Sequence, residues 1–248
     1  MGLKGTQGSA YPYIFNRAVA IGRRNIQRDF STVYHETWGG ASQQPDTTPV
    51  AAKDADGILT TTAPLDTTTL TVTPNGALAS GGIATLIPLY GPWTGGRNVV
   101  VTVTHSSSIV AVSGIITGID INGRQIAETW SVSATGTSKT STGKKAFKYV
   151  TQITIVSVAD ATADSVTVGD GDVLGLDVRC SVKSGLKELV SGTIVTNGVL
   201  VAYDATNSGW ASTFSADPRG TYAPNTIPDA SAVYDLWFIT DDPEFSDG

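Results

Sequence analysis

Short runs of alternating apolar and polar residues begin near residue 59 and recur along the rest of the chain. Val, Ile and Thr dominate these runs, and Gly, Pro, Asn and Ser separate them. Alternation with a period of two predicts strands that bury one face, and closely spaced short strands are typical of sandwiches and barrels. The predicted strands are residues 68–73, 83–90, 97–104, 109–121, 124–133, 146–158, 165–168, 172–182 and 233–240. The predicted fold is therefore all-β, a sandwich or jelly-roll-like antiparallel domain.

Two Asn-Gly pairs predict sharp reversals of the chain. Asn122-Gly123 stands between two alternating segments, and both residues tolerate the positive φ that a two-residue type I′ turn requires. Asn197-Gly198 repeats this arrangement between residues 193–196 and 199–203. We therefore expect two tight hairpins.

The first fifty residues do not keep any period for long, and Gly and Pro interrupt them repeatedly. We divide the chain into a mostly irregular, extended N-terminal arm at 1–51 and a β-rich domain at 52–248, with a sub-boundary near residue 182. Six aromatic rings on a free arm would promote aggregation, so we expect them to bury against this domain or a neighbouring subunit. The predicted interface residues of the arm are Tyr11, Tyr13, Phe15, Arg17, Arg23, Arg24, Phe30, Tyr34 and Trp38.

Charge and hydropathy narrow the classes of partner. The 248 residues include 16 Lys and Arg against 22 Asp and Glu, a net charge of −6, whereas binding to nucleic acid needs a dense basic face. No apolar run approaches the length of a membrane helix, and Pro12 and Arg17 interrupt the segment that comes nearest to a signal-peptide core. We expect no nucleic-acid partner, no membrane partner and synthesis in the cytoplasm without export. The single cysteine, Cys180, cannot form an intrachain disulfide.

Few residues are placed for catalysis or metal binding. Neither His35 nor His105 has the spacing of a zinc site. His105 precedes three serines, but a polar loop residue is favoured over a Ser–His pair. None of the glutamates has a catalytic setting, and Glu128 is expected to pair with a neighbour such as an arginine on the next strand. We predict no catalytic residue, no metal site, no cofactor and no enzymatic activity.

The segment Asp170-Gly171-Asp172 offers oxygen ligands for calcium, with Asp160 and Asp164 upstream. It lacks the loop length and the closing glutamate of a known calcium loop. A Gly-rich β-turn leading into a strand at Val173 is therefore the favoured interpretation.

Four segments carry further motifs: RNVVVTVT at 97–104, ITGIDINGRQIAETW at 116–130, KKAFKYVTQITIVSV at 144–158 and DPRGTYAP at 217–224. In this order they resemble a module of tailed-phage virion proteins, in which segments like tGtDanGnaitEt and KaFktVtsItv flank a Ser/Thr/Gly-rich loop. The ending of such proteins reads like D-x-RGTY-P followed by PDGs, and Ala230 stands here in place of that glycine. The resemblance covers about residues 97–240.

The resemblance implies a structural virion protein of the head decoration or cement type, made in the host cytoplasm and located on the capsid surface. Its expected partners are the major capsid protein and further copies of itself, in a dimer or trimer. The basic cluster of the Ser/Thr/Gly-rich loop is then a candidate contact to an acidic capsid neighbour, with solvated loop lysines as the alternative. The cluster comprises Lys139, Lys144 and Lys145, with Lys148 beside them.

Two other functions stay open. The chain can be a tail, neck or fibre component of the virion, because the module does not fix a location. It can also be a carbohydrate-binding β-sandwich that displays a tryptophan to a glycan. The candidates are Trp93, Trp130 and Trp210, and a buried core position is the favoured interpretation for each.

Overall fold

The computed structural model describes residues 32–38, 50–63, 68–86, 96–105, 111–132, 137–157, 164–176, 180, 184–203, 217 and 219–240. Strands make up 62% of this part and none of it is helical, so the all-β prediction is confirmed. None of it forms a helix that could cross a membrane. The strands are β1 (Thr32–Trp38), β2 (Leu59–Thr62), β3 (Thr69–Val72), β4 (Ala79–Ser80), β5 (Ile83–Thr85), β6 (Arg97–His105), β7 (Val112–Ile119), β8 (Gln125–Val132), β9 (Ser138–Thr142), β10 (Tyr149–Ser157), β11 (Asp164–Gly175), β12 (Ser184–Val190), β13 (Thr193–Val195), β14 (Val199–Ala202), β15 (Gly220–Ala223) and β16 (Tyr234–Thr240).

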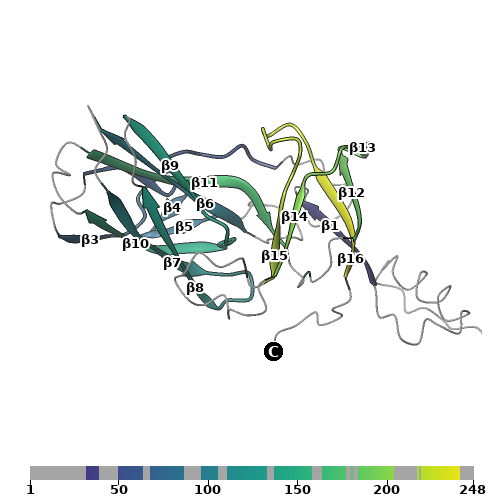
Figure 1. Cartoon of the computed structure of the whole chain (residues 1–248), viewed down its shortest axis with the longest axis horizontal. Coiled ribbons are helices and arrows are strands. Elements are labelled where there is room, and N and C mark those ends of the chain that lie inside the picture. The colour runs from purple at the N-terminus through teal and green to yellow at the C-terminus, as the bar shows by residue number, and fades with distance from the viewer. Residues whose placement is uncertain are drawn as a thin grey trace, which may run out of the picture.

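The described strands form three antiparallel sheets (Figure 1). The first has the order β4-β5-β10-β7-β8, with β3 also paired to β10. The second has the order β14-β15-β11-β6-β9, with β2 also paired to β11. The third has the order β1-β16-β12-β13.

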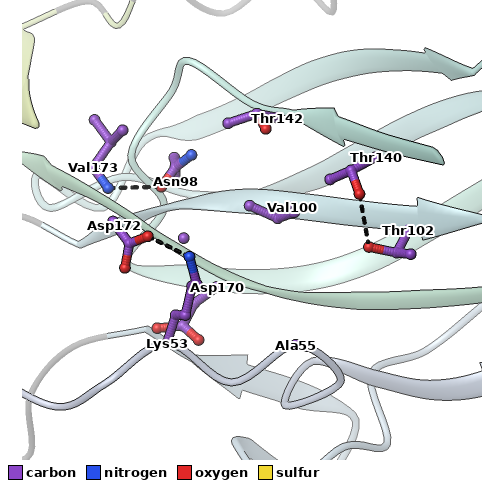
Figure 2. A pocket seen from close by; sticks show the side chains of 11 residues that line it. Lys53, Ala55, Asn98, Val100, Thr102, Thr140, Thr142, Asp170, Asp172 and Val173 are labelled. Atoms are coloured by element: carbon purple, nitrogen blue, oxygen red, sulfur yellow. Dashed lines mark hydrogen bonds and ion pairs between the residues drawn. The ribbon is translucent and has the colours of Figure 1, made fainter. Parts of the chain in front are cut away.

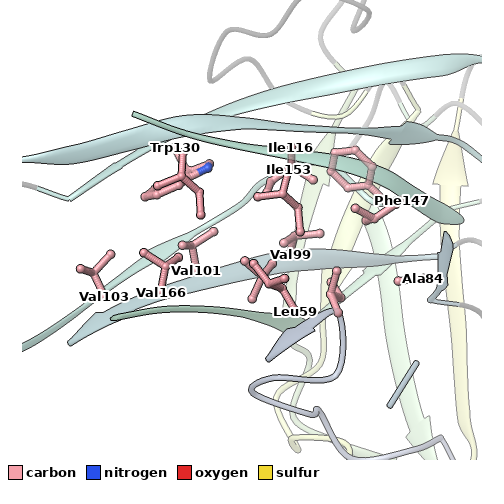
Figure 3. Packing of buried hydrophobic residues seen from close by; sticks show 14 of the residues in the cluster. Leu59, Ala84, Val99, Val101, Val103, Ile116, Trp130, Phe147, Ile153 and Val166 are labelled. Carbon is pink, nitrogen blue, oxygen red and sulfur yellow. The ribbon is translucent and has the colours of Figure 1, made fainter. Parts of the chain in front are cut away.

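The larger hydrophobic core lies between the first and second sheets, which makes this part of the fold a sandwich. Alternate residues of β7 are buried, as a strand with one solvent-facing side requires. Figure 3 shows Trp130, Ile116 and Ile153 from the first sheet directed toward Val101 and Val166 from the second.

A second core lies between the third sheet and the part of the second sheet that contains β14, β15 and the end of β11. Leu174 and Leu200 contribute from the second sheet, and Leu236 and Phe238 from β16. The two cores meet along β11, which supplies Val166 and Val168 to the first and Leu174 to the second. The core thus divides within one continuous strand, whereas the predicted sub-boundary, residue 182, lies outside the described residues.

The predicted β-turn at Asp170-Gly171-Asp172 is wrong. These residues lie inside β11, which unites the two strands predicted at 165–168 and 172–182. The register of β11 against β6 shifts between Asp170 and Leu174, so the extra residues form a β-bulge. Glycine and aspartate favour a chain reversal there, but the buried Arg97 side chain binds the Gly171 carbonyl and the Asp170 carboxylate and holds them in the strand.

The predicted hairpin at Asn122-Gly123 is present, because β7 and β8 pair in register from Val112 and Val132 to Ile119 and Gln125. Its predicted turn type is wrong. The N–H of Gly123 donates to the Asp120 carbonyl over 3.1 Å, and only Gly123 of the pair has a positive φ, 80°. A type I turn followed by a left-handed glycine closes the hairpin.

The Asp120 side chain favours this turn. Its carboxylate is buried and accepts hydrogen bonds of 2.9 Å from the N–H groups of both Asn122 and Arg124. An aspartate that binds the backbone two residues ahead stabilises a turn of its own, which a reading of the Asn-Gly pair alone overlooks.

The hairpin predicted at Asn197-Gly198 is wrong, because β13 pairs with β12 and β14 pairs with β15. Asn197 and Gly198 instead lie in the connection between β13 of the third sheet and β14 of the second. The two-residue hairpin lies just before it, at Ser191-Gly192, where both residues have positive φ, 48° and 79°. That combination is the type I′ turn expected at the other two sites.

Part of the predicted arm belongs to the domain. β1 pairs along its whole length with β16, from Thr32 against Thr240 to Trp38 against Tyr234. The division at residue 51 therefore does not hold for Thr32–Trp38, which pairs with β16 through the backbone groups on one side of the strand. The predicted interface residues Tyr11, Tyr13, Phe15, Arg17, Arg23, Arg24 and Phe30 lie outside the described residues.

Replacing Gly123 with Val should lower the stability of the domain. No atom lies within 4 Å of an added Cβ there, so the cost comes from the backbone, where a left-handed residue other than glycine loses roughly 1–2 kcal/mol, and a β-branched one more. We expect a melting temperature lower by about 4–8 °C for roughly 2 kcal/mol. Gly123→Asn is the matched control, since asparagine tolerates this region, and should lose less. Equal melting of all three proteins would contradict the turn assignment.

Candidate functional site

Charged side chains occupy the inner faces of several strands, at positions where alternation predicts apolar residues. We call these residues the inner charges, and each is at most 8% exposed: Arg97 and His105 on β6, Glu128 on β8, Asp164 and Asp170 on β11, and Glu188 on β12. A buried charge without a partner is costly, so the partners of this set reveal what it does.

Arg97 fills the bulge of β11. Its Nε donates to the Gly171 carbonyl over 2.7 Å, and its Nη1 lies 2.8 Å from both Asp170 Oδ2 and the Ala51 carbonyl. Asp170 in turn accepts a 2.6 Å hydrogen bond from the N–H of Asp54. Burial lowers the pKa of Arg97 and raises that of Asp170, and their attraction opposes both shifts. The pair fastens the segment before β2 to the point where the two cores meet.

Asp217 joins two of the four motif segments, those at 144–158 and 217–224. Its Oδ2 accepts a 2.8 Å hydrogen bond from the N–H of Ala146, in the Lys-Lys-Ala-Phe segment. Its Oδ1 accepts from the N–H groups of Arg219 and Gly220 at 2.9 and 3.3 Å, which orders the Arg-Gly-Thr-Tyr segment. The carboxylate is 1% exposed, so it serves as a structural acceptor.

The rest of the Arg-Gly-Thr-Tyr segment is held as firmly. Arg219 Nη1 donates to the Leu176 carbonyl over 2.9 Å, at the end of β11. Gly220 has a φ of 106°, and a Cβ there would lie 2.7 Å from the Val201 carbonyl, so no other residue fits without a shift.

One carboxylate oxygen of Glu188 accepts hydrogen bonds from three residues of other segments. Its Oε2 accepts from the Tyr222 hydroxyl, from the N–H of Gly198 at 2.8 Å and from that of Asn225 at 3.3 Å. Burial, and then Glu188, raise the pKa of Tyr222, so the hydroxyl stays protonated and donates. Asn197 adds hydrogen bonds with the Glu188 N–H and the Leu186 carbonyl, both 2.9 Å.

Glu128 holds the loop that contains the predicted lysines. Its Oε1 accepts a 2.7 Å hydrogen bond from the N–H of Lys144, and its Oε2 lies 3.4 Å from that of Lys145. The expected arginine partner on a neighbouring strand is therefore wrong. Burial raises the pKa of Glu128 to about 7, against the opposing effect of these hydrogen bonds and of the Lys145 charge.

The three predicted loop lysines do not form one surface. Lys145 is fully buried and its Nζ donates to the Ala127 carbonyl over 2.8 Å, so its prediction as a solvent-facing contact is wrong. Lys139 is half-buried within β9, opposite Val103, rather than in a loop. Lys144 alone of the three is exposed. Two adjacent lysines thus differ in exposure, although Glu128 contacts the backbone N–H groups of both.

His105 and Asp164 form another buried pair, in which the Asp164 carboxylate contacts the imidazole Nδ1. The prediction of His105 as a polar loop residue is wrong, since it ends β6 and is 8% exposed. Of the aspartates considered for calcium, Asp164 binds His105 and Asp170 binds Arg97, while Asp160 lies outside the described residues. Within the described residues, no group of three acidic, histidine or cysteine side chains could hold a metal ion.

A pocket of about 400 Å³ opens over the outer face of the second sheet (Figure 2). Lys53 Nζ lies 2.6 Å from Asp172 Oδ2 at one end, and the Thr102 and Thr140 hydroxyls lie 3.4 Å apart at the other. The lining residues are Lys53, Ala55, Asn98, Val100, Thr102, Thr140, Thr142, Asp170, Gly171, Asp172 and Val173. Both carboxylates are paired with Arg97 or Lys53 and no lining residue is aromatic, so the pocket can bind polar groups but offers no stacking platform.

The tryptophans considered for glycan binding and the arm residues Tyr34 and Trp38 do not form one site among the described residues. Trp130 is 3% exposed and belongs to the larger core, so it is not displayed to a ligand. Trp93 and Trp210 lie outside the described residues. Tyr34 and Trp38 stand on β1, where their backbones pair with Phe238 and Tyr234 of this chain.

The sequence reading missed Arg97, Glu188, Asp217 and Arg219 as site residues. The first two stand on the apolar side of an alternating strand, and this out-of-pattern charge is a signal that the sequence does contain. Asp217 and Arg219 lie in a Pro/Gly-rich segment without a period, where nothing local indicates burial.

No protein-family model matches the chain, and no curated protein or solved structure matches it either.

Ala230 lies where the phage-like motif has glycine, and its φ is 66°. The surrounding turn is fixed, because the Ala230 N–H donates to the Val50 carbonyl and the Val50 N–H to the Ala232 carbonyl, at 3.0 and 2.9 Å. The backbone there has the left-handed conformation that favours glycine.

Ala230→Gly should raise stability. Relief of a left-handed alanine gains about 1–2 kcal/mol, and the greater freedom of glycine in the unfolded chain removes about 0.4–1 of it. We expect a melting temperature higher by about 1–4 °C for a net gain of roughly 0.5–1 kcal/mol. Ala232→Gly, two residues away, has no positive φ to relieve and should instead melt lower. A lower melting temperature for the Ala230 variant would contradict the conformation.

Glu128 should make stability depend on pH. Its folded pKa, about 7, lies above its ordinary value of 4.5, so its contribution is complete below about pH 4.5 and is lost as the pH rises through 7. The loss can reach about 3 kcal/mol. Urea unfolding at pH 5.5 and 8.5 should show a smaller pH-dependent loss for Glu128→Gln than for the wild type. Asp56→Asn removes an exposed carboxylate as a control, and an identical pH dependence in all three proteins would contradict the prediction.

Proposed function

We propose that the chain is a structural virion protein of a tailed phage, a capsid decoration or cement protein that binds the outer head surface and bridges neighbouring capsomers. The contact between Asp217 and Ala146 carries the proposal, because it unites motif segments that are 71 residues apart in the sequence. A chance likeness of two short segments gives no reason for them to meet. Their contact supports a single structural module.

The roles of four buried carboxylates support a structural function. Asp170, Asp217, Glu128 and Glu188 each accept hydrogen bonds from backbone N–H groups. Carboxylates used in this way fix strands and turns, whereas a general acid or base must reach a substrate. We therefore propose a protein without enzymatic activity.

A cement protein acts through binding energy alone. Each contact of standard size, about 800 Å² per partner, adds stability to a shell under internal pressure without any reaction. The proposed partners are the major capsid protein and further copies of this chain, at symmetric positions on the capsid surface. The predicted contacts of the arm, residues 1–31, belong to this proposal.

The alternatives have less support. A tail, neck or fibre component would use the same module, and copy number distinguishes it. Within the described residues a carbohydrate-binding sandwich has little support, because Trp130 is buried and the lining of the pocket contains no aromatic residue. Trp93 and Trp210 lie outside these residues.

Particles assembled without this protein should form but release DNA at a lower temperature or on milder osmotic shock. Quantitative mass spectrometry of purified virions should find on the order of hundreds of copies, against about a dozen for a neck protein. Adding back the full chain should restore stability, while a chain lacking residues 1–31, which keeps β1, should bind at reduced occupancy. Defective attachment with unchanged head stability would favour a fibre or glycan-binding role, and failure to form particles a connector role.

A further inference from the structure

Exposed apolar side chains gather in one part of the chain. Four of the six large hydrophobic residues that are exposed among those described lie within residues 194–227. We call them the apolar edge: Ile194 and Val199, each 62% exposed, Ile227, 57% exposed, and Val201, 37% exposed. The other two, Ile83 and Val156, belong to the first sheet.

Glu188 brings the segments of the apolar edge together. Gly198, next to Val199, and Asn225, two residues before Ile227, both donate to its carboxylate. Glu188 itself pairs in register with Val195, next to Ile194. One buried side chain thus holds all three segments at the same end of the molecule, where Figure 1 shows β13 and β14.

β14 is an edge strand of the second sheet, where its one described partner is β15. Alternate N–H and C=O groups of such a strand point away from its partner and can pair with another strand. Natural edges are usually protected by charge, proline or a bulge. Residues Thr193–Ala202 contain no charged residue and no proline, and β14 pairs with β15 without a register shift.

We propose that β14 is a self-association surface, on which β14 of a second copy pairs antiparallel across a two-fold axis. With Leu200 opposite its own symmetry mate, Val199 of each copy lies opposite Val201 of the other. This register places the exposed valines of both copies on one face and the buried Leu200 residues on the other, as the period of two requires. In the proposed dimer, Ile194 and Ile227 extend the contact beyond the paired strands, because Glu188 holds their segments beside Gly198.

A second copy fits better than a different protein because of the lack of charge. A two-fold axis pairs a strand with a second copy of the same strand, so a strand carrying charge of one sign would oppose its own charge. The chain has a net charge of −6, yet this segment carries none. Four paired residues are too few for a stable interface of about 20 residues a side, so the flanking apolar residues must contribute.

The test compares two valines of equal exposure. Val201→Lys places charge on the proposed interface, and Val156→Lys, also at 37% exposure, places it on β10, which pairs with strands on both sides. In sedimentation equilibrium, we expect the wild type and Val156→Lys to dimerise. Val201→Lys should associate more weakly, with a dimer dissociation constant at least about tenfold higher. Val199→Lys should behave like Val201→Lys. A monomeric wild type, or dimers unaffected by both β14 variants, would overturn the proposal.

Amide exchange locates the contact without any substitution. Protection at Val199–Ala202 should increase with protein concentration, while β9, the opposite edge of the same sheet, should not change. An increase at β9 alone would place the interface elsewhere and overturn the proposal.

The interface rests on the proposed function for its biological setting, and the two fail separately. A wild-type dimer in solution that binds no phage head would overturn the virion role and leave the interface intact. A monomeric wild type that still decorates heads would overturn the interface and leave the virion role intact.

Discussion

The burial of Arg97 inside the bulge of β11 is the constraint on which the rest of the structure depends. β11 contributes side chains to both hydrophobic cores, and the bulge lies where it passes from one to the other. The guanidinium binds the bulge carbonyl of Gly171, the Asp170 carboxylate and the carbonyl of Ala51, so one side chain fixes three parts of the chain. Removing it would leave Asp170 buried beside fewer partners, which is far more costly than losing an exposed ion pair.

The same principle recurs at each place where segments distant in sequence must meet. Asp217 binds Ala146, Glu128 binds the Lys144 loop, and Glu188 binds Gly198 and Asn225. An apolar core rewards burial without specifying which loop packs where, whereas a buried carboxylate is satisfied only by particular N–H groups. These carboxylates therefore give the loops defined positions, which the proposed binding role requires.

Strand pattern was the part of the fold that sequence could predict, because burial on one face imposes a period of two. Most predicted strands and the first hairpin are present. The three errors in turns share one cause, the competition of side-chain hydrogen bonds with local turn preference. Asp120 changed the type of one turn, Arg97 kept Asp170-Gly171-Asp172 in a strand, and Glu188 fixed Asn197-Gly198 between two sheets. Of the candidate site, the inner charges were visible as breaks in the apolar pattern, but their partners come from distant segments that no local pattern identifies.

The continuity of β11 has a mechanical consequence. In the proposed role the subunit spans two neighbours and is pulled from both ends. A molecule with two cores joined by a loose linker would extend at the linker first. Here the connection is a strand, paired with β6 on one side and with β2 and β15 on the other. Tension between the cores acts along this strand, so its ladder of hydrogen bonds is loaded in shear and shares the force among many bonds. The joint between the two halves is therefore stiff, and strain on one half passes to the other.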